Sequence, residues 1–383
     1  MKHVVLSTFI AASLAMPAAA DTLRIGTATA QTGALAYADA PTMLGMKMAV
    51  DDINAAGGIG GKTKIELVEK DVRSDPAQTS IAAQELADDG VSVIVLPGDS
   101  DPALAAIGVV GAAEIPAIST VASSPTLPEI GGDYMFSNFP GDNVQAAVSA
   151  KWAYDQGYRT AWIVYSPDTQ YTTMPLYFAD VFTRLGGKML GQSTNTLGQQ
   201  DFSAIATTIA AQDPQPDVVM TSAYEPDFPS LLKALRAAGV TSQIIGSDGI
   251  DSPTTFSLGE VGEGVVFTTA GFPTPGSALE KFNKEFEARY GKALDTIYSA
   301  VGYDLIKVIE AAVLKAGSTD PKAIRNAMAS LENVQGATGT ITYAGTNGMP
   351  IRQVSLVRVK NGAREFVAQP TPDPALIPEP RME

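Results

Sequence analysis

The 383-residue chain contains no cysteine and a single histidine, His3. The first absence excludes disulfides, thiol nucleophiles and thiolate metal ligands. Because His3 lies in a segment that we expect to be removed, the remaining chain would also lack the side chain most used in acid–base catalysis and metal binding. No stretch approaches the roughly 20 uninterrupted apolar residues of a membrane-spanning helix. Composition therefore argues against most classes of enzyme and against an integral membrane protein.

Residues 1–20 have the composition of a secretory signal peptide. A basic start at Lys2 precedes an apolar core, and the segment ends in three alanines, the kind of small residue that signal cleavage requires. We expect a mature chain that begins at Asp21 and diffuses freely in the periplasm, because without cysteine it cannot be lipidated as bacterial lipoproteins are. The formal net charge of −15 argues against nucleic acid as a partner.

Helix-like and strand-like segments alternate along the chain, which predicts an α/β fold. Within residues 45–71, a helix ends at Asn54, a glycine-rich reversal follows at 57–61, and an alternating strand occupies 64–70. Such alternation implies parallel sheets, and about 360 mature residues suit two domains. Strands are predicted at 23–27, 65–69, 91–96, 117–119, 160–165, 218–222 and 243–246, and helices at 77–88, 102–113, 144–156, 174–185, 202–211, 228–238, 278–290 and 297–315.

The alternation pauses at three places, which we interpret as crossings between two lobes. They lie at residues 136–142, 268–275 and 343–350, each with proline and glycine. The first lobe is then formed by residues 21–139 and 271–343, and the second by 140–270 and 344–383. The proline-rich end of the chain, 369–383, is predicted to be an extended strap or disordered.

The amino-acid sequence of residues 45–71 resembles that of the branched-chain-amino-acid-binding family of periplasmic solute receptors, the type I substrate-binding proteins of ABC importers. Further matches are residues 236–239, 247–249 and 302–304, and the resemblance covers nearly the whole mature chain. It implies the type I periplasmic binding fold, in which two Rossmann-like lobes with parallel sheets are joined by a three-strand hinge. It also implies a protein that closes on a small ligand and docks on a membrane permease.

Because ligands of open α/β sheets bind beyond the carboxyl ends of the strands, we expect the site in the loops that follow them. In the first lobe these loops carry Asp99 and Ser100, and then Val121, Ala122 and Ser123. Their hydroxyl groups and backbone amides could bind a polar ligand group. Alternatively, Asp99, Ser100 and Ser123 only cap helices, which is the usual role of these residue types.

In the second lobe the corresponding loops carry Tyr171, Tyr224 and Asp248. The tyrosines could cover a ligand and Asp248 could pair with a cationic group. Alternatively, the tyrosines are packing residues and Asp248 forms a turn before Gly249.

The resemblance assigns roles to these residues. It implies that hydroxyl-bearing loops of the first lobe hold the ligand's carboxylate or amide, with Ser123 in the second such loop beside the backbone of Val121. An acid at the position of Asp248 would hold an ammonium group, while Tyr171 and Tyr224 close over the ligand. Tyr37 matches an aromatic residue of the first loop.

Asp99 departs from the family pattern, because it stands where the family usually has a serine that binds the ligand's carboxylate. An ionised Asp99 at 4 Å from that carboxylate would repel it by about 4 kcal/mol at an effective dielectric constant of about 20. This penalty exceeds a typical hydrogen bond of about 1 kcal/mol. Either Asp99 points away and Ser100 replaces the serine, or the ligand carries an amide, urea-like, amine or guanidinium group and is not a simple α-amino acid.

The sequence therefore predicts a monomeric binding protein, without cofactor or metal, that delivers a small amino acid, amide or amine to an ABC transporter permease. A periplasmic sensor that presents its ligand to a chemoreceptor or kinase is the alternative. A hydrolase that uses Asp99, Asp101 and Asp248 is disfavoured, because the chain shows neither a Walker loop nor a nucleophile elbow. Trp152 and Trp162 are predicted to be core residues.

Overall fold

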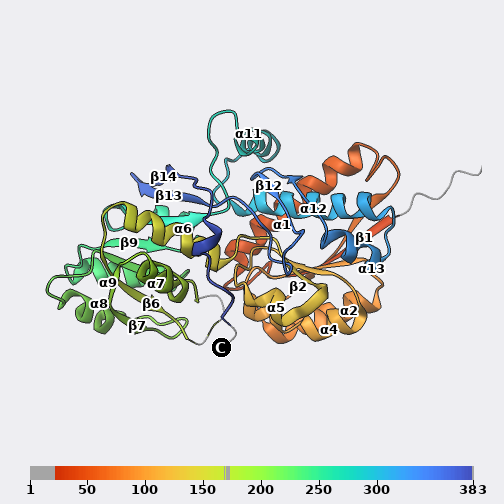
Figure 1. Ribbon diagram of the computed structural model, residues 1–383. Helices are drawn as coiled ribbons and strands as arrows, with labels where there is room; N and C mark the ends of the chain where they lie inside the picture. Colours follow the sequence, from red (N-terminus) through yellow and green to blue (C-terminus); the bar gives the residue numbers. More distant parts are fainter. Residues whose placement is uncertain (1–21, 168, 170–172, 382–383) are drawn as a thin grey trace, which may run out of the picture.

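The computed structural model describes residues 22–167, 169 and 173–381. Figure 1 shows two lobes side by side, each built around one β-sheet with helices on both faces. The predicted signal peptide and Tyr171 lie outside the described residues.

The sheet of the first lobe has five strands in the order β2-β1-β3-β4-β5, and every neighbouring pair is parallel. The central strands are buried on both faces, as expected for short Val- and Ile-rich strands of a parallel sheet. The strands are β1 (Thr22–Thr29), β2 (Lys64–Asp71), β3 (Val93–Leu96), β4 (Ala117–Ser119) and β5 (Met135–Ser137).

The sheet of the second lobe has seven strands in the order β14-β13-β10-β9-β8-β6-β7. The pairs from β7 to β10 are parallel, whereas β13 runs antiparallel to β10 and β14 antiparallel to β13. The strands are β6 (Thr160–Tyr165), β7 (Lys188–Thr194), β8 (Val218–Thr221), β9 (Gln243–Gly246), β10 (Val266–Thr269), β13 (Ser355–Lys360) and β14 (Ala363–Ala368). A separate hairpin pairs β11 (Val334–Gln335) with β12 (Thr340–Ile341).

Helices cover both faces of each sheet and bury separate apolar clusters (Figure 1). The helices of the first lobe are α1 (Ala36–Ala55), α2 (Pro76–Asp88), α3 (Ser100–Leu104), α4 (Ile107–Ala113), α5 (Thr126–Gly131), α11 (Ala278–Tyr290), α12 (Tyr298–Ala316) and α13 (Pro321–Met328). Those of the second lobe are α6 (Asp142–Asp155), α7 (Met174–Arg184), α8 (Ser203–Ala210), α9 (Asp227–Ala237) and α10 (Pro253–Phe256). Within the described ranges, no helix is both long and apolar enough to cross a membrane.

Helices α1 and α12 approach so closely that only glycine fits at two positions of their contact. A Cβ atom on Gly45 would collide with the carbonyl group of Ser299, and one on Gly302 would collide with that of Thr42. The missing side chains let the two backbones touch. This contact places the start of α12 against the N-terminal half of α1, and it brings Tyr298 next to Tyr37.

The glycine-rich reversal after α1 forms as the sequence predicts. The N–H group of Gly58 donates to the carbonyl oxygen of Ile53 at 2.8 Å, and both Gly57 and Gly58 have positive φ, as in a glycine C-cap. The side chain of Asn54 then bonds the backbone of Ile65 in both directions, at 2.8 and 2.9 Å. These bonds fix where β2 begins relative to the end of α1.

One predicted element is wrong: residues 102–113 do not form a single helix. They are divided between α3 and α4. The break occurs where the N–H group of Ala106 bonds the carbonyl oxygen of Ala103, three residues back, in place of the four-residue spacing of an α-helix. The predicted core positions of Trp152 and Trp162 are confirmed, since both are at least nine-tenths buried.

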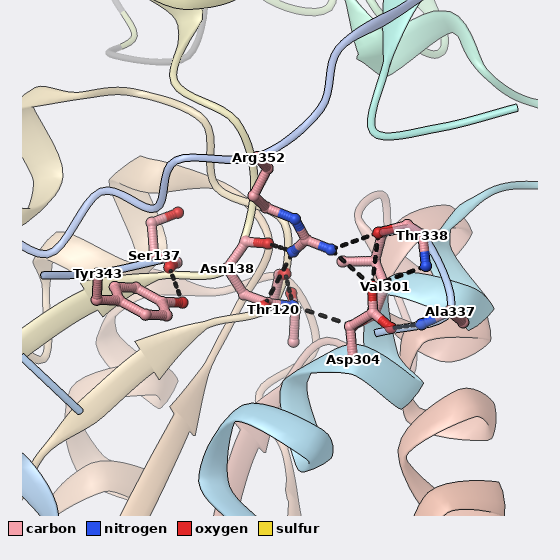
Figure 2. A network of polar contacts seen from close by, with 9 residues as sticks. All are labelled: Thr120, Ser137, Asn138, Val301, Asp304, Ala337, Thr338, Tyr343 and Arg352. Carbon is pink, nitrogen blue, oxygen red and sulfur yellow. Dashed lines mark hydrogen bonds and ion pairs between the residues drawn. The ribbon is translucent and has the colours of Figure 1, made fainter. Parts of the chain in front are cut away.

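Three segments connect the two lobes, between β5 and α6, between β10 and α11, and between β12 and β13. A buried ion pair lies where they meet (Figure 2). The guanidinium group of Arg352 is 2.7 Å from Asp304 in α12, and the two side chains are 1% and 0% exposed. Arg352 also donates to Asn138 in the first segment and to Thr338, which lies beside Gly271 of the second. The network therefore joins the first and third connections to α12 of the first lobe, and it lies next to the second connection.

The C-terminal segment lies as an extended strap along the second lobe. The amide group of Asn143 donates to the carbonyl oxygen of Pro378 at 2.8 Å, and the N–H group of Arg381 donates to the hydroxyl of Tyr177, also at 2.8 Å. Arg184 donates to the carbonyl oxygen of Ala375 at 3.2 Å. The strap thus contacts both α6 and α7.

Candidate ligand-binding site

A cavity lies where the loops after the strands of the two sheets face each other. Its volume is about 10 Å³, which is room for about one water molecule, because the two walls meet through Tyr224 and Asp99. Both lobes supply its walls. The lining residues are Leu35, Tyr37, Ala38, Asp39, Gly98, Asp99, Val121, Tyr224, Asp248 and Tyr298.

Asp39 organises the first-lobe wall. Its carboxylate accepts hydrogen bonds from the N–H groups of Ala30 (2.8 Å) and Gly98 (2.9 Å) and from the hydroxyl of Thr120 (2.7 Å). These partners follow β1, β3 and β4 respectively, so one side chain holds three strand ends together. Burial raises the pKa of Asp39 to about 6, while the three hydrogen bonds act in the opposite direction.

Asp99 both caps a helix and faces the opposite lobe. Its Oδ1 accepts the N–H group of Asp101 at 3.0 Å at the start of α3, and its Oδ2 accepts the hydroxyl of Tyr224 at 3.2 Å. Asp99 is only 8% exposed, and burial raises its pKa to about 6. Asp99 therefore caps α3 and also lines the cavity.

Three tyrosine rings form the aromatic part of the cavity wall. The ring of Tyr37 stacks on Tyr224 with 6.4 Å between centroids, and it meets Tyr298 edge-on at 6.3 Å. Burial raises the pKa of all three hydroxyl groups, which keeps them protonated and able to donate. The hydroxyl of Tyr298 donates to the carbonyl oxygen of Asp248 at 3.0 Å.

Asp248 is positioned by the second lobe and by the first connection. Its Oδ1 accepts the side-chain amide of Gln145 at 3.0 Å, and the same amide donates to the carbonyl oxygen of Pro140 at 3.0 Å. Gln145 is held in turn by the hydroxyl of Thr268 at 2.7 Å. Asp248 is 2% exposed, and burial raises its pKa to about 7.

The cavity carries negative and aromatic groups but no cationic side chain among its lining residues. Across residues 22–167, 169 and 173–381, no ion pair involves Asp39, Asp99 or Asp248. The cation of a neighbouring ion pair, Arg364, binds Asp251. The carboxylates of the cavity are therefore compensated by neutral hydrogen-bond donors alone.

The structure brings five of the predicted site residues to the cavity wall, namely Tyr37, Asp99, Val121, Tyr224 and Asp248. It does not bring Ser100, Ala122 or Ser123 there, although all three are buried. The hydroxyl of Ser100 has no hydrogen-bond partner within the described part of the chain, and the side chain of Ser123 lies against the carboxyl group of Asp142. Tyr171 lies outside the described residues.

Sequence reasoning missed Asp39, Tyr298 and Gln145. Each lies near the start of a helix: Asp39 in α1, Tyr298 in α12 and Gln145 in α6. The available signal was that Asp39 follows Tyr37 by two residues and that Tyr298 is the second residue of a predicted helix. Neither signal shows which way the side chain points.

Comparison with known proteins identifies the family of this chain. A family model described as "Periplasmic binding protein" matches residues 22–364. The chain belongs to this family. This chain is 27% identical over 364 residues to the Leu/Ile/Val-binding protein BraC3 of Rhizobium johnstonii, and the alignment covers 93% of this chain and 97% of that protein. It is 26% identical over 320 residues to a leucine-, isoleucine-, valine-, threonine- and alanine-binding protein of Pseudomonas aeruginosa, covering 81% and 83%.

Among solved structures, the leucine binding protein LivK of Thermotoga maritima superposes with a TM-score of 0.83 at 27% identity, covering 92% of this chain and 99% of that one. The family resemblance and the type I periplasmic binding fold are thereby confirmed. The family model describes a binding protein, and the relatives named here are binding proteins and not enzymes.

Proposed function

We propose that this protein captures a small polar ligand, an amino acid, amide or related amine, between its two lobes in the periplasm. The closed form would then deliver the ligand to the permease of an ABC transporter. The observation that carries this proposal is the cavity whose walls come from both sheets, with Asp99 and Tyr224 in contact across it. A ligand held by both walls favours the closed arrangement over an open one by its differential affinity.

The connections between the sheets provide the hinge of this motion. The Arg352 network anchors the first and third segments to α12 of the first lobe (Figure 2). We propose lobe boundaries at 139/140, 270/271 and 343/344, so that the second lobe turns as one body beyond this anchor. Hinge closure of this kind needs only a few residues to change their backbone angles.

We propose ligand contacts for Tyr37, Asp99, Val121, Tyr224 and Asp248, which line the cavity. The predicted contributions of Ser100, Ala122, Ser123 and Tyr171 remain predictions. The fold does not name the ligand, because a solute binding protein of R. palustris solved in complex with benzoate superposes with a TM-score of 0.80 at only 19% identity.

A thermal-shift screen combined with small-angle X-ray scattering tests the proposal. The screen covers amino acids, amides, ureas, amines and aromatic acids. A bound ligand at about 100 times its Kd should stabilise the fold by about 2.7 kcal/mol, and the radius of gyration should fall as the lobes close. A ligand that binds without any fall in the radius of gyration would contradict closure, and the absence of any ligand would contradict the binding function.

A further inference from the structure

We infer that the ligand is a small organic cation, such as an alkylamine or a guanidine, that carries no carboxylate group. The inference deepens the proposed function and rests on it. It is drawn from the arrangement of three carboxylates, three tyrosine rings and occupied hydrogen-bond donors around one cavity.

The carboxylates come from both lobes and face a shared space. Asp39 and Asp99 belong to the first lobe and Asp248 to the second, and each is more than nine-tenths buried. Their present partners are neutral donors, which satisfy oxygens but add no positive charge. A buried carboxylate without a counter-ion is unfavourable, and a ligand cation would supply that counter-ion as the lobes close.

Three donors that a ligand carboxylate would meet in the first lobe are already used, and the hydroxyl of Ser100 is not part of the cavity lining. The N–H group of Gly98 donates to Asp39 and that of Asp101 donates to Asp99. The hydroxyl of Thr120 also donates to Asp39. An anionic ligand group would therefore meet negative charge and would have to compete for these donors. An α-amino acid brings such a group, whereas the corresponding amine does not.

The tyrosine rings suit the same type of ligand. Tyr37 lies between Tyr224 and Tyr298, with centroid distances of 6.4 and 6.3 Å. The hydroxyls of Tyr224 and Tyr298 are held by Asp99 and by the backbone of Asp248. Aromatic walls next to carboxylates attract ammonium and guanidinium groups through cation–π interactions.

Matched ligand pairs test the inference on the protein without residues 1–20. Isothermal titration calorimetry compares 3-methylbutylamine with leucine and agmatine with arginine, since each amine is its amino acid without the carboxylate. A wider panel adds quaternary amines and guanidines. We expect an amine or guanidine to bind, and the matched amine to bind at least about tenfold tighter than its amino acid.

Two results would overturn the inference. If leucine or another α-amino acid binds as tightly as its amine, and the lobes close on it, the cation assignment fails while the binding function stands. If no amine or guanidine binds, the assignment fails; if no compound of any class binds either, the binding function fails with it.

Variants of Asp99 test whether its negative charge causes the preference for an amine over its amino acid. Asp99→Asn keeps the size of the side chain and an oxygen to accept the N–H group of Asp101, so the cap of α3 is retained. We expect about a tenfold or greater loss of amine affinity and a smaller difference between the members of each ligand pair. Asp51→Asn removes the same charge from an exposed position of α1 and should leave both unchanged. Unchanged amine affinity in Asp99→Asn would also overturn the inference.

Discussion

Replacing Arg352 by alanine should destabilise the protein more than any exposed ion-pair variant. The change leaves the carboxylate of Asp304 buried without its cation and removes the donor to Asn138 (Figure 2). Removing one partner of a buried ion pair costs about 3–5 kcal/mol. At about 2–4 °C per kcal/mol, the Tm should fall by roughly 6–20 °C, towards the lower end for a chain of this size.

The measurement is thermal unfolding followed by far-UV circular dichroism, with two further variants for comparison. Arg352→Lys keeps the charge, but a single ammonium group cannot match the planar fork that reaches Asn138, Asp304 and Thr338, so we expect an intermediate loss. Lys151→Ala removes the cation of an exposed pair with Asp155 and should cost less than about 1 kcal/mol. If Arg352→Ala costs no more than Lys151→Ala, the network does not anchor the hinge.

Three further predictions concern packing, charge and the contact across the cleft. Gly302→Ala should separate α1 from α12, because its Cβ atom would collide with Thr42; a Tm within about 2 °C of the parent protein would contradict this close contact. Affinity for an amine should rise between pH 5 and 8, because a cation favours the ionised form of Asp99 and Asp248, whose pKa values are about 6 and 7. The other titratable groups near these two carboxylates are acids or tyrosines that stay neutral over this range, and Arg364 is already paired with Asp251. They are Asp39, Asp101, Asp142, Asp251, Tyr37, Tyr224 and Tyr298. Titration calorimetry that shows amine affinity falling from pH 5 to pH 8 would refute the predicted direction. Tyr224→Phe should weaken closure by about 1.5–3 kcal/mol, the value of a hydrogen bond to a charged group, and an unchanged radius of gyration and ligand affinity would show that the contact with Asp99 is unimportant.

The sequence pattern was sufficient for the elements with a strong local signal. The reversal after α1 was predicted from its glycines, because the turn needs positive φ angles at these positions. The buried strands β3, β8 and β9 were predicted from short runs rich in Val and Ile. The two-residue strands β11 and β12 and the half-exposed strands β7 and β14 were missed. Their residues lack a long apolar or alternating pattern, and pairing with a neighbouring strand decides their conformation.

For the site, the strand-end rule pointed to Asp99, Tyr224 and Asp248, which the structure places at the cavity wall, because parallel strands have their carboxyl ends at one edge. Tyr298 could not be predicted, since its place beside Tyr37 depends on the glycine contact between α1 and α12. Sequence reasoning also left open whether Asp99 or Ser100 faces the cavity. The choice of Asp99 depends on a hydrogen bond to a residue 125 positions away in the other lobe, which no local pattern contains.

A crystal structure of the protein with the ligand that raises its Tm most would test the central claim directly. We predict closed lobes with a ligand nitrogen within hydrogen-bond distance of both Asp99 and Asp248, and with Tyr37 and Tyr224 against the cation. A ligand carboxylate in that position, with Asp99 turned away and Ser100 as its donor, would contradict the account.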